Sequence, residues 1–107
     1  MPDINPDIDT AALKFSLAQT AYRLDDTALG NRYVKGVDDF ITDQLDYNYS
    51  LLQNNKEGID NRTIQMGMQL LNGMADSAKT SNQPELGNQL LAQLNDYENK
   101  FAALQQR

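Results

Sequence analysis

Apolar residues recur every three or four positions through most of the chain, in segments separated by clusters of Asn, Asp, Gly and Ser. This spacing is typical of amphipathic helices, and no stretch alternates apolar and polar residues for long enough to indicate a strand. The pattern predicts helices over roughly residues 9–24, 27–54, 60–80 and 83–106. Amphipathic helices joined by short connections favour an all-α, antiparallel four-helix bundle.

Each predicted helix has one apolar face that we expect to form the core of the bundle. The fourth of these faces also fits a short coiled-coil contact, although a place inside the bundle is the favoured interpretation. The predicted core faces are Leu13, Leu17, Ala21 and Leu24; Val34, Val37, Ile41, Leu45 and Leu52; Ile64, Met68, Leu71, Ala75 and Ala78; and Leu86, Leu90, Leu94, Tyr97, Phe101 and Leu104.

Short polar side chains mark the expected helix ends. Asp9 and Asp60 each precede an apolar run and are predicted N-caps, because a carboxylate there accepts hydrogen bonds from free backbone N–H groups. Asn82 and Glu85 have the spacing of a capping box at the start of the last helix. Gly58 is expected in the left-handed conformation that closes a helix.

The boundary between the first two segments depends on the run Asp25–Asp26–Thr27, which supplies a stop and a cap. Gly30 and Gly36 follow at once, and glycine weakens a helix interior. An irregular start of the second helix, or one long bent helix across both segments, therefore stays open as an alternative.

The length of 107 residues suits one domain spanning 1–107, in which residues 1–8 are expected to form an extended or disordered tail. No apolar run is long enough to cross a bilayer, so we expect no membrane insertion. The first ten residues are acidic, where a secretory signal is basic and then apolar. The expected location is therefore the cytoplasm.

The chain carries 15 acidic and 9 basic side chains, for a net charge of −6. The excess lies in residues 1–55, where nine Asp stand against four Lys and Arg. This charge disfavours nucleic-acid phosphates and anionic lipids, and it favours a partner protein with a basic surface.

Few side chains in the sequence could act in catalysis. The absence of His and Cys excludes thiol chemistry, imidazole acid–base chemistry and metal sites built on those side chains. The Ser residues have no His to activate them, and no pair of acids falls on an apolar face. We therefore expect a protein that is not an enzyme, with no catalytic residue, no cofactor and no metal.

Three acids share one face of the second predicted helix: Asp39, Asp43 and Asp46. Tyr47 and Tyr49 lie next to them, and both rings cannot join the core face, so at least one is expected to be partly exposed. Tyrosine is enriched at binding hot spots, and acids steer a basic partner. These five residues are the predicted partner-binding site, with a solvated acidic face and rings that cover the edge of the core as the alternative.

The leading functional hypothesis is a small acidic adaptor or regulator that binds another protein. An immunity-type inhibitor that neutralises a basic toxin, nuclease or bacteriocin target is the first alternative. A structural homo-oligomer, built through the fourth helix, is the second, so a homodimer stays open. A small-molecule pocket lined by Met and Tyr side chains is a weaker hypothesis.

Overall fold

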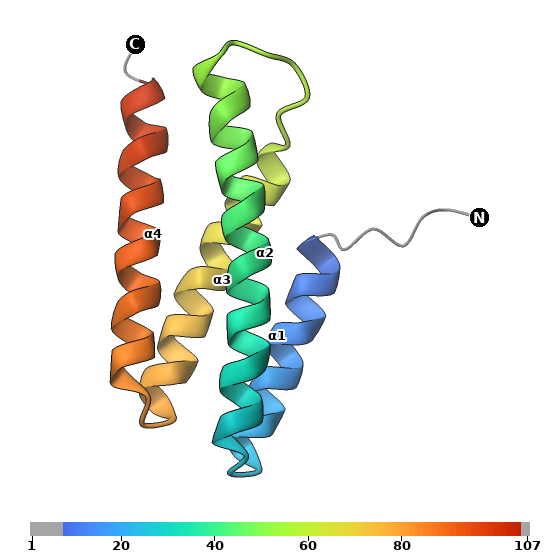
Figure 1. Cartoon of the computed structure of the whole chain (residues 1–107), viewed down its shortest axis with the longest axis vertical. Helices are drawn as coiled ribbons and strands as arrows, with labels where there is room; N and C mark the ends of the chain where they lie inside the picture. The colour runs from blue at the N-terminus through green and yellow to red at the C-terminus, as the bar shows by residue number, and fades with distance from the viewer. Residues whose placement is uncertain (1–7, 106–107) are drawn as a thin grey trace, which may run out of the picture.

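The computed structural model describes residues 8–105, and these residues form an all-α four-helix bundle. The helices are α1 (Ile8–Arg23), α2 (Thr27–Gln53), α3 (Asn61–Thr80) and α4 (Pro84–Gln105). The bundle consists of the antiparallel hairpin α1–α2 and the antiparallel hairpin α3–α4 (Figure 1). The predicted fold is confirmed, and every predicted helix boundary lies within one residue of the observed one.

Residues 1–7, most of the predicted tail, lie outside the described residues. Ile8 was included in that predicted tail, and this is wrong: Ile8 begins α1 and is only 3% exposed. An apolar side chain that can reach the core is more stable inside it than in water, which favours starting the helix here.

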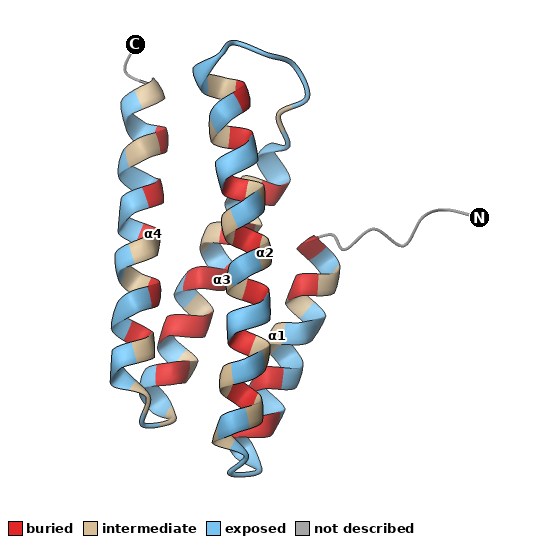
Figure 2. Cartoon of the chain, in the orientation of Figure 1, coloured by how far each residue is buried: buried red, intermediate tan, exposed pale blue. Residues whose placement is uncertain are grey.

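The two central helices, α2 and α3, each contact all the other helices of the described chain. By contrast, α1 and α4 lie on opposite sides of α2 and do not contact each other (Figure 1). One hydrophobic cluster draws residues from all four helices, and the buried residues of α4 lie on the side that faces α2 (Figure 2). The largest fully buried side chains are Val34, Val37, Ile41, Leu45, Leu71, Met74 and Leu90.

Three helices end in the same way, with a polar residue at positive φ. Asp25, Asn55 and Asn82 have φ values of 62°, 54° and 63°. In each case the next residue donates its N–H to a carbonyl five residues earlier, a pattern that closes helix C-termini. These hydrogen bonds are Asp26 N to Ala21 O at 2.9 Å, Lys56 N to Leu51 O at 2.8 Å, and Gln83 N to Ala78 O at 2.8 Å.

These endings settle three of the expectations. Asp25 turns the chain between α1 and α2, so the alternative of one long bent helix is wrong, and α2 is continuous through Gly30 and Gly36. Asn82 ends α3 and does not cap α4, so the predicted capping box is wrong as well. Asn tolerates the left-handed conformation, and that competing role decided the outcome. Gly58 has a positive φ of 95°, but α2 ends at Gln53 and is closed by Asn55, so the expectation that Gly58 closes the helix is wrong.

Carboxylates cap two helices. Asp26 accepts from the backbone N–H of Leu29 at 3.2 Å. Asp60 accepts from the backbone N–H of Thr63 at 3.0 Å and from its hydroxyl at 2.8 Å, and these bonds lower the pKa of Asp60. The predicted cap at Asp60 is therefore confirmed. The predicted cap at Asp9 is wrong, because α1 begins one residue earlier and places Asp9 inside its first turn.

The predicted core face of α1 is mostly wrong. Leu13, Leu17 and Leu24 are 68%, 49% and 74% exposed. The buried face is instead Ile8, Ala11, Ala18, Ala21 and Tyr22, which includes only one residue of the predicted stripe. Both faces repeat at three- and four-residue intervals, so periodicity alone does not distinguish them, and the prediction chose the face with the larger side chains. The alanine face is buried instead, because small side chains allow neighbouring helices to approach closely.

One polar side chain, Asn48, occupies the buried face of α2 and is 2% exposed. Its amide oxygen accepts from the backbone N–H of Asp60 at 2.8 Å, and its amide nitrogen donates to the carbonyl of Gln44 at 2.9 Å. Both groups of the buried amide are therefore satisfied. This residue holds the start of α3 against α2.

Candidate functional site

The three acids of the predicted site lie on the outer surface of α2. Asp39, Asp43 and Asp46 are all exposed, as their spacing on one helix face indicated. Within the described chain, neither Asp39 nor Asp43 takes part in an ion pair or a side-chain hydrogen bond. Two carboxylates are thus available to a cation on another molecule.

The two tyrosines are not in the same environment. Tyr47 is 62% exposed, whereas Tyr49 is half-buried and packs against the core cluster. Residues two apart on a helix point roughly 200° away from each other. The structure therefore keeps Tyr47 with the exposed residues of α2 and turns Tyr49 toward α4.

Tyr49 belongs to an aromatic contact between α2 and α4. Its ring meets Phe101 edge to face, with centroids 5.7 Å apart. Lys100 Nζ lies 5.7 Å from the ring centroid of Tyr49 and 5.4 Å from that of Tyr97, within the range of cation–π attraction. Lys100 also pairs with Asp96 at 3.3 Å. These contacts indicate that Tyr49 stabilises the bundle.

Asp46 links the acidic row to α4. Its Oδ1 accepts a hydrogen bond of 2.7 Å from the hydroxyl of Tyr97, which is 5% exposed. Burial and this neighbouring carboxylate both raise the pKa of Tyr97, so the phenol keeps its proton and acts as a donor. Asp46 therefore has a structural partner that Asp39 and Asp43 do not have.

A fourth acid, Asp38, is half-buried against α4. Gln93 Nε2 donates to its Oδ2 at 3.3 Å, and the hydroxyl of Thr42 donates to its Oδ1 at 3.5 Å. Burial is the largest influence on this carboxyl and raises its pKa. The amide oxygen of Gln93 is buried, with no hydrogen-bond partner among the described residues. Asp38 thus lies in the contact with α4, outside the exposed row.

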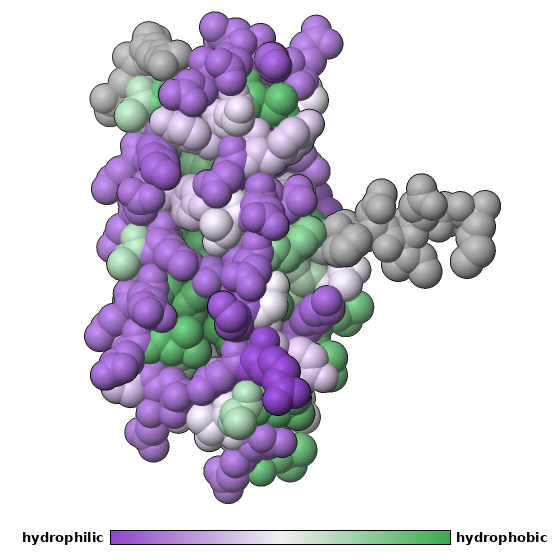
Figure 3. Space-filling model, viewed as in Figure 1, coloured by the Kyte–Doolittle hydropathy of each residue, from purple (hydrophilic) through white to green (hydrophobic). Residues whose placement is uncertain are grey.

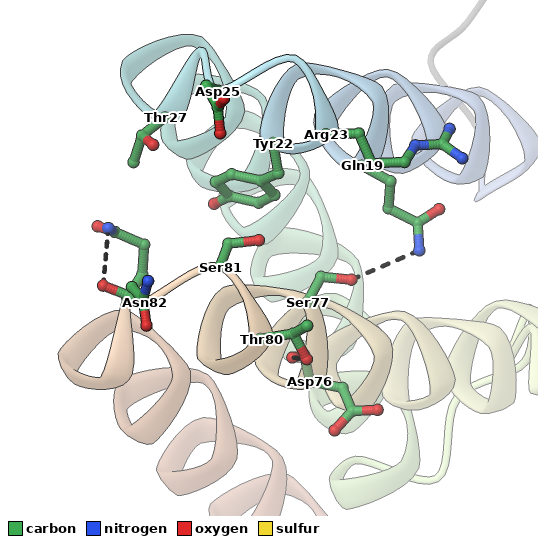
Figure 4. A pocket seen from close by; sticks show the side chains of 11 residues that line it. Gln19, Tyr22, Arg23, Asp25, Thr27, Asp76, Ser77, Thr80, Ser81 and Asn82 are labelled. Atoms are coloured by element: carbon green, nitrogen blue, oxygen red, sulfur yellow. Dashed lines mark hydrogen bonds between the residues drawn. The ribbon is translucent and has the colours of Figure 1, made fainter.

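A polar cavity of about 670 Å³ opens where the C-terminal ends of α1 and α3 approach each other (Figure 4). Its walls are hydroxyl, amide and charged side chains, and Gln19 donates to the Ser77 hydroxyl at 3.4 Å across it. Such walls suit a small polar molecule. The lining residues are Gln19, Tyr22, Arg23, Asp25, Thr27, Asp76, Ser77, Thr80, Ser81, Asn82 and Gln83.

This cavity was not predicted from the sequence. Its only local signal is the run of hydroxyl and amide side chains at residues 80–83. The opposite wall comes from α1, about sixty residues earlier, and no spacing rule connects the two segments.

A second, more apolar groove of about 920 Å³ lies between the end of α2, the start of α3 and the end of α4. Its apolar lining includes Leu52, Ile64, Met68, Phe101 and Leu104. Met68 is the one methionine in this lining and no tyrosine belongs to it, so the groove is not the predicted pocket of Met and Tyr side chains.

Within residues 8–105, no group of three or more Asp and Glu side chains could hold a metal ion. No helix in the described part of the chain has the length and apolar character needed to cross a membrane. No protein-family model, curated protein or solved structure matches this chain. The candidate site therefore rests on its own geometry.

Proposed function

We propose that this protein is a non-enzymatic binding protein whose contact surface is the outer side of α2, formed by Asp39, Asp43, Asp46 and Tyr47. The observation that carries this proposal is the pair of exposed, unpaired carboxylates at Asp39 and Asp43 on the same helix as the exposed ring of Tyr47. An exposed tyrosine offers a large contact area at low entropic cost, and acids nearby fix the orientation of a basic partner.

The charges along α2 favour a partner that binds in one direction along the helix. Arg32 and Lys35 are exposed toward the N-terminal end of the helix, and the acids follow one to three turns later. A partner helix or loop with its basic residues beside Asp39 and Asp43 would place them away from Arg32 and Lys35. This arrangement supports a specific complex in preference to general attraction by the net charge of −6.

Tyr49 was part of the predicted binding site, and the proposal now leaves it out. Its ring packs on Phe101 and under Lys100, so a partner could reach it only by displacing those contacts. We assign it a structural role at the contact between α2 and α4. The proposed surface is therefore smaller than the predicted partner-binding site.

The test is affinity capture from an extract of the source organism, followed by calorimetric titration of any purified partner. The test variant is Asp39→Asn/Asp43→Asn/Tyr47→Ala, and the matched control is Asp76→Asn/Glu98→Gln. The control removes two exposed charges from α3 and α4 and leaves α2 intact. The expected partner binds the wild type and the control, loses at least tenfold in affinity for the test variant, and weakens with added salt.

A partner that binds both variants equally would contradict the proposal, as would an extract in which no protein distinguishes them. If the captured partner is a toxin, a nuclease or a bacteriocin, the immunity-type alternative becomes the specific form of this function. Very tight, salt-sensitive binding to that one target is its expected property.

A further inference from the structure

The outer side of α2 has a regular order of charges along the helix. Arg32 and Lys35 come first, Gly36 follows, and Asp39 and Asp43 come next. All five residues are exposed, and they lie within about 100° of arc on a helix with 3.6 residues per turn. In Figure 1, α2 lies in front of α3, and the surface over it is mostly hydrophilic (Figure 3). We call these five residues the charged ridge.

The four charges of this ridge form no ion pair within one copy. Among residues 8–105, the ion pairs join Arg62 to Asp9 and Lys100 to Asp96, and neither pair includes a residue of the charged ridge. Two cations and two anions, in separate halves of one exposed helix face, are therefore available to another molecule.

Gly36 is the one glycine in the described helices that no neighbouring side chain crowds. A Cβ added to any of the others would come within 3.2 Å of a neighbouring side chain, whereas nothing lies within 4 Å of a Cβ added to Gly36. A glycine inside a helix costs about 1 kcal/mol relative to alanine, and glycine is typical of positions where another backbone approaches closely. Since no part of the bundle approaches Gly36, the open space there indicates contact with another molecule. The four crowded glycines are Gly30, Gly67, Gly73 and Gly87.

We propose that the charged ridge pairs with the same ridge of a second copy of this chain, antiparallel and related by a two-fold axis. This inference rests on the proposed function, because it uses the same outer side of α2 and names the partner. The midpoint between Lys35 and Asp39 is Val37, and the midpoint between Arg32 and Asp43 lies just after it. A two-fold axis at that point places Arg32 opposite Asp43 of the second copy. The same axis places Lys35 opposite Asp39 of the second copy, and the symmetry repeats both contacts.

Other residues of α2 fit the same axis. Gly36 lies one residue from the midpoint, where the two helices approach each other most closely. Tyr47 comes beside the first turn of α2 of the second copy, where Ala28 is exposed and Leu29 is half-buried. The dipoles of the two helices oppose each other favourably in this direction, whereas a parallel pair would place like charges side by side.

A partner with basic residues alone is the less suitable occupant of the whole ridge. It would neutralise Asp39 and Asp43 and leave Arg32 and Lys35 without acids. A second copy supplies acids for both cations and cations for both acids, so every charge of the ridge has an opposite charge across the contact.

The test is sedimentation equilibrium of the full chain across a wide concentration range. The wild type is expected to pass from 12.0 kDa toward twice that mass as concentration rises. Arg32→Glu/Lys35→Glu makes every charge of the ridge negative, and Asp39→Lys/Asp43→Lys makes every charge positive. Self-association of each variant alone should be more than tenfold weaker. An equimolar mixture of the two variants should dimerise again, because each then meets the opposite charge.

Gly36→Leu tests the close approach at the centre of the contact. It should weaken dimerisation more than tenfold, although leucine is the better helix former. Its matched control is Ala92→Leu, which adds a leucine at an exposed position of α4. Asp76→Lys/Glu98→Lys is the control for charge, because it reverses two exposed acids outside α2. Both controls should dimerise like the wild type. Far-UV circular dichroism checks that each variant is folded, which is expected because the substituted positions are exposed.

A wild type that stays monomeric throughout overturns this inference. So does a dimer that survives the charge reversals or Gly36→Leu, and so does a mixture of the two charge variants that stays monomeric. A monomeric wild type that binds another, basic protein through Asp39 and Asp43 overturns the self-pairing and leaves the proposed function intact. The two failures are therefore distinguishable.

Discussion

The ring of Tyr22 lies against the backbone of Gly30, so closely that a Cβ atom added to Gly30 would stand 2.5 Å from Cε1 of the ring. The ring cannot easily move away, because Tyr22 is 8% exposed and its hydroxyl donates to Asn31 Oδ1 at 2.7 Å. The end of α1 therefore meets the start of α2 at a position where only glycine fits. Gly30 was expected only to weaken the start of the helix, but the packing of Tyr22 requires glycine at this position.

Gly30→Ala should destabilise the protein although alanine is the better helix former. Overpacking a core contact of this kind costs about 1–3 kcal/mol. Gly36→Ala is the matched control in the same helix, because no atom lies within 4 Å of its added Cβ. That variant should gain about 0.5–1 kcal/mol from helix propensity. Urea unfolding followed by circular dichroism measures both changes, and a gain in both variants would contradict the predicted clash.

The two neighbouring tyrosines of α2 should differ in their effect on stability. Tyr49→Ala removes a ring that packs on Phe101 and beneath Lys100, and it should lower the free energy of unfolding by about 1–3 kcal/mol. Tyr47→Ala removes an exposed ring and should change that free energy by no more than about 0.5 kcal/mol. Equal losses would mean that Tyr47 also supports the fold, and they would weaken its assignment to a binding surface.

The sequence predicted most of the fold because three of the helices each have one dominant apolar face. In α4, for example, Leu90, Leu94, Tyr97 and Phe101 are buried as their spacing indicated. The interpretation failed in α1, where two apolar faces compete. Its leucine face is the larger, yet close packing selected the alanine face, and that choice depends on Gly30 and other residues of the neighbouring helices.

The candidate site was predicted only in part, for a related reason. The spacing of Asp39, Asp43 and Asp46 on one helix was enough to place all three at the surface. The positions of Tyr47 and Tyr49 depend on where α4 lies beside α2, and helical periodicity does not contain that information. The polar cavity joins α1 to the turn between α3 and α4, so it appears only once the chain is folded.

Protonation of the Asp38 carboxyl should stabilise the folded protein. Burial raises its pKa above the ordinary value of 3.8, so the folded protein binds this proton at a higher pH than the unfolded chain does. The ionised form therefore costs stability above the folded-state pKa, and this cost disappears below pH 3.8.

Asp38→Asn imitates the neutral carboxyl, and its amide oxygen can still accept from Gln93 Nε2. It should be more stable than the wild type at pH 7, and the difference should vanish below pH 3.8, which urea titrations across this range would show. Asp39→Asn is the matched control, since it removes the same charge from an exposed neighbour. An equal gain from Asp39→Asn would assign the effect to the net charge, in place of the burial of Asp38.

The left-handed residues that end three helices offer the most direct stabilising substitution. Asn82 has a φ of 63°, a conformation that costs most residues with a Cβ about 1–2 kcal/mol, costs Asn less, and costs glycine almost nothing. Asn82→Gly should therefore raise the free energy of unfolding by up to about 1 kcal/mol, because greater freedom of the unfolded chain offsets part of the gain.

The matched control is the neighbouring residue Ser81, which has a φ of −96° that any residue adopts. Ser81→Gly relieves no backbone strain and should destabilise the protein. Opposite signs at adjacent positions, measured in the same urea titration, would identify backbone conformation as the cause. A loss of stability in both variants would show that the Asn82 side chain contributes more to the α3–α4 turn than its φ angle costs.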